Sequence, residues 1–102
     1  MGTIRKISDL QLGSINSSKI LSVSTAETLY VMGSGNRAVE FTNLGSYIVY
    51  YGNSGFTAGT GGVILQNGSK MWDSVVDNFQ MALKLNSAGV TSQVVAHEYA
   101  GN

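Results

Sequence analysis

The chain alternates short apolar or β-branched runs with turns rich in glycine, serine and asparagine. The clearest run is Tyr47–Tyr51 (YIVYY), where every residue is aromatic or β-branched, a composition typical of strands. Similar runs recur along the chain at Lys19–Ser24, Glu27–Met32, Arg37–Thr42, Val63–Gln66, Lys70–Val76, Phe79–Leu85 and Val90–Tyr99. About eight short strands predict an all-β antiparallel sandwich or barrel, jelly-roll-like or immunoglobulin-like.

Alternation within these runs predicts which side chains form the core. Phe41, Trp72 and Phe79 fall in alternating apolar sets and are expected inside. In the YIVYY run, Ile48 and Tyr50 share the face opposite to Val49. If that face points outward, the pair forms an apolar patch of the kind that marks an interface.

Two segments allow further predictions. Asn67-Gly68 is suited to a tight hairpin turn. Trp72–Leu85 also carries apolar residues at helical spacing, so a helix is the alternative to strands there. The neighbouring strands and glycine-rich turns favour strands.

The N-terminal segment has a different pattern. Ile4, Ile7 and Leu10 are scattered through a polar background, which indicates an extended arm or a short helical turn. We therefore expect an N-terminal arm over residues 1–18 and a β-sandwich domain over residues 19–102. The aliphatic side chains of the arm are candidates for contact with a partner.

Composition excludes several classes of protein. The 102 residues suit one domain, and the formal net charge is zero, with 12% charged residues. A neutral chain lacks the basic field that nucleic-acid binding requires. No apolar run is long enough to span a membrane, and the N-terminus does not resemble a signal peptide. There is no cysteine for a disulfide or a thiolate metal site.

Few residues are candidates for catalysis or for binding a metal ion or a phosphate group. His97 is the single histidine, and we interpret it as an ordinary strand residue. The carboxylates, including Asp73, Asp77 and Glu98, show no convergent spacing and are interpreted as solvated, so no metal or cofactor is expected. The glycine-rich segment Gly52–Gly62 precedes a strand, which favours a surface loop over a phosphate loop. Its Phe56 is either a contact for a partner or packed on its own domain.

Several segments together resemble a β module of tailed-phage structural proteins. They are Val39–Ser46 (VEFTNLGS), Val49–Gly52 (VYYG), Gly62–Gly68 (GVILQNG), Asn86–Thr91 (NSAGVT) and Val94–Tyr99 (VVAHEY). The resemblance covers Val39–Tyr99 and rests on turn chemistry and alternation. Such modules occur as head decoration proteins and as parts of tails and fibres.

The resemblance implies a non-enzymatic virion protein, made in the host cytoplasm and located on the capsid surface. We expect it to bridge major capsid protein subunits as a homo-oligomer, with a trimer as the first hypothesis. The candidate contact residues are Ile4, Ile7, Leu10, Ile48, Tyr50 and Phe56. The main alternative is a tail-associated carbohydrate- or receptor-binding module. A small enzyme is a third alternative, for which the sequence supplies few candidate groups.

Overall fold

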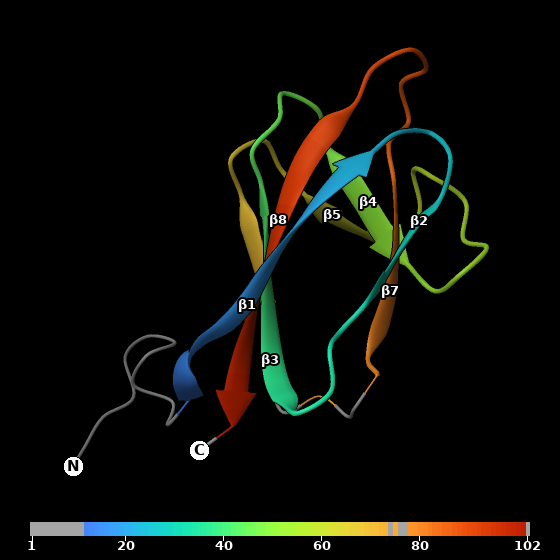
Figure 1. The fold of residues 1–102 in the computed structure, drawn as a ribbon. Helices are drawn as coiled ribbons and strands as arrows, with labels where there is room; N and C mark the ends of the chain where they lie inside the picture. Colours follow the sequence, from blue (N-terminus) through green and yellow to red (C-terminus); the bar gives the residue numbers. More distant parts are fainter. Residues whose placement is uncertain (1–11, 74, 76–77, 102) are drawn as a thin grey trace.

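The computed structural model describes residues 12–73, 75 and 78–101 and contains eight strands in this part of the chain (Figure 1). Each of the eight overlaps one of the runs that the sequence predicts. They are β1 (Leu12–Val23), β2 (Thr28–Val31), β3 (Asn36–Asn43), β4 (Val49–Gly52), β5 (Gly62–Ile64), β6 (Ser69–Trp72), β7 (Gln80–Lys84) and β8 (Ser92–Gly101).

The strands form two four-stranded antiparallel sheets, with the orders β1-β8-β3-β6 (sheet A) and β2-β7-β4-β5 (sheet B). The first strand therefore pairs with the last, the second with the seventh, the third with the sixth, and the fourth with the fifth. This nested pairing is that of one long hairpin wrapped into two layers, which is a jelly roll. Of the two predicted sandwich topologies, the jelly roll is the one observed.

One boundary differs from the prediction. β1 begins at Leu12, so residues 12–18, expected in the arm, belong to the sandwich. The reason is the length of β8, which continues to Gly101 and offers β1 a partner along this stretch; Ile15 lies opposite Tyr99. A register shift on each side of Ile15 marks an irregularity in the pairing. Residues 12–18 are rich in serine, so they lack the apolar pattern from which a strand could have been predicted.

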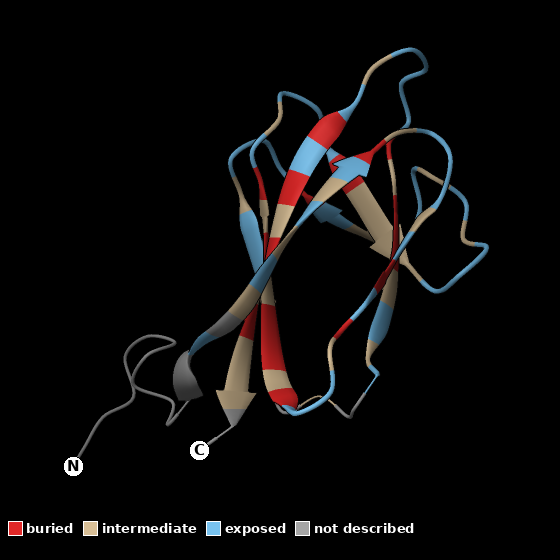
Figure 2. Cartoon of the chain, in the orientation of Figure 1, coloured by how far each residue is buried: buried red, intermediate tan, exposed pale blue. Residues whose placement is uncertain are grey.

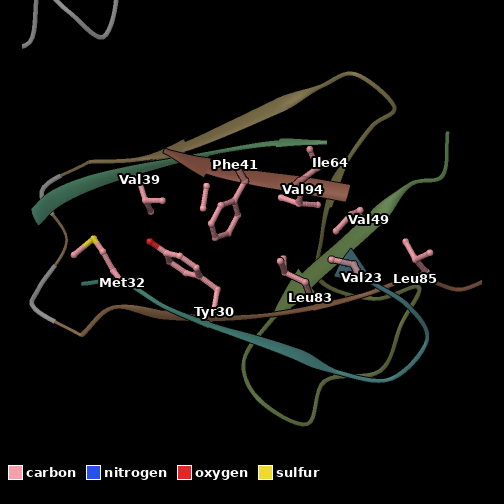
Figure 3. Packing of buried hydrophobic residues seen from close by; sticks show 11 residues of the cluster. Val23, Tyr30, Met32, Val39, Phe41, Val49, Ile64, Leu83, Leu85 and Val94 are labelled. Carbon is pink, nitrogen blue, oxygen red and sulfur yellow. The ribbon is translucent and has the colours of Figure 1, made fainter. Parts of the chain in front are cut away.

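The core lies between the two sheets, and both contribute side chains to it (Figure 3). Phe41 of β3 is fully buried and packs edge-on against Tyr30 of β2, with ring centroids 4.9 Å apart. Trp72 contacts Phe41 and Tyr51, both with centroids at 5.1 Å. Each large apolar side chain buried in this way stabilises the fold by about 1.5–3 kcal/mol. Figure 2 shows the alternation of buried and exposed residues along β8.

The segment between β6 and β7 confirms the strand interpretation. Ser69–Trp72 and Gln80–Lys84 are strands in different sheets, not the ends of one helix. The turn at Asn67-Gly68 is present, with Asn67 at φ 57° and the Gly68 amide 2.8 Å from the Leu65 carbonyl. It does not close a hairpin, because β5 and β6 belong to different sheets. The apolar residues on both sides of the turn are compatible with two strands that pair as a hairpin and with two strands that enter different sheets.

In the described residues, no helix is long and apolar enough to cross a bilayer.

Candidate functional site

A shallow groove of about 290 Å³ lies at the loop end of the sandwich. It is formed by the β3–β4 connection, the first residues of β4, the β5–β6 turn and the β7–β8 connection. Figure 1 shows these connections at the end opposite to the start of β1 and the end of β8. The lining combines aromatic, aliphatic, amide and hydroxyl groups: Ser46, Tyr47, Ile48, Tyr50, Gln66, Asn86 and Ser87.

Two of the predicted contact residues lie in this groove. In β4, Val49 is buried, so the alternation turns Ile48 and Tyr50 to the outer side of sheet B. Of the two faces that the sequence left open, the one with Ile48 and Tyr50 is therefore the outer one. Tyr47 precedes the strand and is 38% exposed, so it joins the groove instead of following Val49 into the core.

The groove wall is held by a buried amide that sequence reasoning missed. Asn43, at the end of β3, has no exposed surface. Its Nδ2 donates to the Tyr47 carbonyl at 2.7 Å and to the Ile64 carbonyl at 3.2 Å, while its Oδ1 accepts from the Gly45 amide at 3.0 Å and from Ser92 Oγ at 2.6 Å. These four bonds use both donors and both lone pairs of the side chain. The sequence did offer a signal for this role: Asn43 directly follows the predicted strand Arg37–Thr42 and falls on the same face as Phe41.

Backbone hydrogen bonds fix the other walls. The Leu44 amide donates to the Gln93 carbonyl at 2.8 Å, and the Leu85 amide donates to the Ser24 carbonyl at 2.8 Å. The Asn43 amide donates to the Gly68 carbonyl at 2.9 Å. All three connections that line the groove are thus tied to the sandwich, so the groove is largely pre-formed.

A second polar centre lies inside the core at the opposite end of β8. Glu98 is 1% exposed, although the sequence analysis interpreted it as solvated. The correction follows from register, because Glu98 shares the inward face of β8 with Val94 and Ala96. Its Oε1 accepts from Ser17 at 2.7 Å and from Asn36 at 3.1 Å, and its Oε2 from Tyr30, from the Gly33 amide at 3.3 Å and from Lys19 at 3.3 Å.

This centre is a structural clamp. Burial alone would raise the pKa of Glu98, but the hydrogen bonds from Tyr30 and the other donors outweigh burial and hold the pKa below its ordinary value. Burial raises the pKa of the Tyr30 hydroxyl, and the adjacent carboxylate raises it further. The carboxylate is therefore charged, and its hydrogen bonds tie β8 to β1, β2, the turn after β2 and the start of β3.

Phe56 packs on its own domain. A side-chain carbon at Gly52 would lie 2.9 Å from the Phe56 ring, and Lys84 Nζ lies 5.1 Å from the ring centroid. Glu27 secures the same loop by accepting from Ser54 Oγ at 2.9 Å and from the Gly55 amide at 2.7 Å. The glycine-rich loop is thus folded back onto the outer face of sheet B, and Phe56 is half-buried there.

The remaining candidates are dispersed. His97 Nδ1 lies 2.8 Å from Ser18 Oγ on the outer face of sheet A, as an ordinary strand residue. Asp73 forms an ion pair with Arg37 at 3.5 Å. Within residues 12–73, 75 and 78–101, acidic and histidine side chains do not gather in groups that could hold a metal ion. Ile4, Ile7, Leu10 and Asp77 lie outside the described residues.

Comparison with known proteins adds no relative. The chain matches no protein-family model, and neither the curated proteins nor the solved structures contain a match to it. The resemblance to the phage module therefore stays a prediction.

Proposed function

We propose that the chain is a non-enzymatic structural subunit of a virion, a decoration protein that binds the major capsid protein on the head surface. The observation that carries this proposal is the exposed edge of sheet A. Ile20 of β1 is 69% exposed, and Ile15 is 49% exposed. Among the described strands, β1 pairs with β8 alone, so its other edge has no partner strand. When a long edge strand carries exposed aliphatic side chains, another segment or a binding partner usually covers it.

Charge does little to protect this edge. Lys19 is the one charged residue of β1, and charged residues on edge strands normally discourage pairing with another chain. Here Lys19 Nζ turns toward Glu98 and donates to the Val31 carbonyl at 3.0 Å. The edge is therefore suited to a partner strand or an apolar surface.

The arm would extend the same contact. Ile4, Ile7 and Leu10 immediately precede β1 in the chain. Each would contribute on the order of 1.5–3 kcal/mol if fully buried against a capsid subunit. Repeated copies around a local symmetry axis, with a trimer as the first hypothesis, would add avidity.

The fold supports the proposal. Jelly rolls recur in viral capsid proteins, and the resemblance to phage modules covers most of the sandwich. The same architecture also occurs in lectins, so the fold does not decide between a shell subunit and a binding module.

The direct test is quantitative mass spectrometry of purified particles from the source. Copies of this chain at a simple ratio to the major shell protein would support the decoration role. A handful of copies per particle would favour a tail position instead. Absence of the chain from particles would overturn the virion proposal.

A variant series tests the contact surface. Ile20→Asp, and separately the double variant Ile4→Asp with Ile7→Asp, should weaken binding to particles that lack this protein while leaving the isolated fold intact. Leu29→Asp is the matched control, because Leu29 is also an exposed aliphatic residue but lies on sheet B, at 45% exposure. Normal binding by all the sheet A and arm variants would contradict this surface.

One observation favours the alternative, a tail-associated carbohydrate- or receptor-binding module. It is the pre-formed groove at the loop end, which the decoration role does not use.

A further inference from the structure

We infer that the groove between the β3–β4, β5–β6 and β7–β8 connections is a binding site for a neutral oligosaccharide. The inference rests on the alternative function above and names its site and ligand class. It does not depend on the virion proposal, since the groove and the β1 edge are separate surfaces.

The aromatic side chains supply the first element of a sugar site. Tyr47 and Tyr50 both line the groove, and Ile48 lies between them in the chain. Tyrosine combines an apolar ring face with a hydroxyl, so it can pack against the C–H face of a pyranose and still bond to water or to a sugar hydroxyl. Tyr47 is 38% exposed, which leaves surface for such a contact.

Exposed polar groups supply the second element. Ser46, Gln66, Asn86 and Ser87 face the same space from three different connections. All four residues are exposed, so their amide and hydroxyl groups are accessible to a ligand. Amide and hydroxyl groups both donate and accept, which matches the alternating donors and acceptors around a sugar ring.

Charge narrows the class of ligand. None of the seven lining residues is ionisable near neutral pH. The nearest cation in the strand register is Lys84, opposite Tyr50, and its ammonium is engaged by the Phe56 carbonyl. An anionic or cationic ligand would enter the groove without a counter-charge. A neutral ligand needs no counter-charge there.

Size and rigidity fit a short glycan. A volume near 290 Å³ is just below the usual range of ligand pockets, so the groove can hold only a small ligand or part of a larger one, such as the end of a glycan. The buried Asn43 fixes the Tyr47 carbonyl, and the turn after β5 is closed by its own hydrogen bond. A pre-formed site reduces the entropy lost on binding. The groove is open, so further sugar units can extend into solvent.

The test is titration of the isotopically labelled chain, followed by NMR, with neutral oligosaccharides of glucose, mannose, galactose and N-acetylhexosamines at millimolar concentration. At least one should give saturable shifts at the amides of Tyr47, Gln66 and Asn86. Tyr50→Ala should weaken that binding roughly tenfold, the effect of losing about 1.4 kcal/mol of contact. Gln66→Ala should weaken it less.

Controls keep the inference falsifiable. Leu44→Ala is the matched control, because Leu44 is an exposed apolar residue of the same β3–β4 connection outside the groove, and its binding should be unchanged. Native amide spectra of each variant exclude unfolding as the cause of a loss. The inference is overturned if no neutral oligosaccharide binds, if shifts map outside the groove, or if oligogalacturonate, an anionic comparator, binds in preference. None of these results alters the copy number in particles, so the virion proposal is tested separately.

Discussion

The hydroxyl of Tyr30 donates a hydrogen bond to the carboxylate of Glu98, and this bond joins the two sheets inside the core. Tyr30 is on β2 of sheet B and Glu98 is on β8 of sheet A, and both are about 1% exposed. The same ring packs edge-on against Phe41. One tyrosine therefore contributes both to the apolar core and to the buried polar centre.

Tyr30→Phe should destabilise the fold by about 1–3 kcal/mol, because a buried carboxylate loses a donor while the apolar contacts remain. The free energy of unfolding in urea is the measurement. Tyr47→Phe is the matched control: its side chain is exposed, so its effect should stay within about 0.5 kcal/mol. Equal effects of the two substitutions would show that the inter-sheet bond contributes nothing.

Glu98 should make the fold sensitive to acid. Its folded-state pKa lies below the ordinary value of 4.5, so the carboxylate stabilises the fold above that pH, and the contribution is lost as the pH falls through the lowered pKa. Urea unfolding measured from neutral pH to well below 4.5 should therefore show that Glu98→Gln is less stable than wild type at neutral pH and that the gap narrows in acid.

Ser17→Ala provides a graded comparison for this pH effect. It removes one donor from Glu98 Oε1, so the carboxylate pKa should rise and stability should be lost at a higher pH than in wild type. A gap between wild type and Glu98→Gln that is constant with pH would contradict the lowered pKa.

Asn43→Ala should be among the most damaging single changes outside the apolar core. It leaves two carbonyls, one amide and one hydroxyl without their partner, and we expect a loss of about 3 kcal/mol or more. Ser92→Ala removes one of these bonds and should cost less. Asn86→Ala, at an exposed position, is the control and should have little effect. Thermal and urea unfolding of the three variants would rank them, and the reverse order would refute this account.

The architecture could be predicted because its signals are local. Alternation along the chain placed Phe41 inside, as the structure confirms, and grouped Ile48 with Tyr50 on one strand face, which the structure turns outward. The jelly-roll order could not be chosen over the immunoglobulin-like one, since pairing of β1 with β8 joins residues from the two ends of the chain. Nothing in the composition of Leu12–Val23 encodes its distant partner.

The polar centres show a different limit. Glu98 shares the face of β8 that carries Val94 and Ala96, so its inward position was available from the sequence, but a carboxylate is normally exposed and was interpreted so. Its donors come from β1, β2, the turn after β2 and the first residue of β3, and only the fold brings them together. The groove is similar: Ile48 and Tyr50 were singled out, whereas Gln66 and Asn86 reach the groove from two other connections, β5–β6 and β7–β8.

The glycine-rich loop gives the last prediction. Glu27 accepts from Ser54 Oγ and from the Gly55 amide, and Phe56 packs beside Gly52. Glu27→Ala should release this loop, and proteinase K should then cleave it severalfold faster, because cleavage follows the population of the opened segment.

The cleavage rate and the mass of the fragments are the measurements, and the new cuts should fall between Asn53 and Gly61. Gln80→Ala is the matched control, as an exposed residue on the same sheet that does not contact the loop in any described interaction. Phe56→Ala should act in the same direction as Glu27→Ala, because both remove an anchor of the loop. Cleavage of Glu27→Ala at the wild-type rate would show that Phe56 and Lys84 hold the loop without the carboxylate.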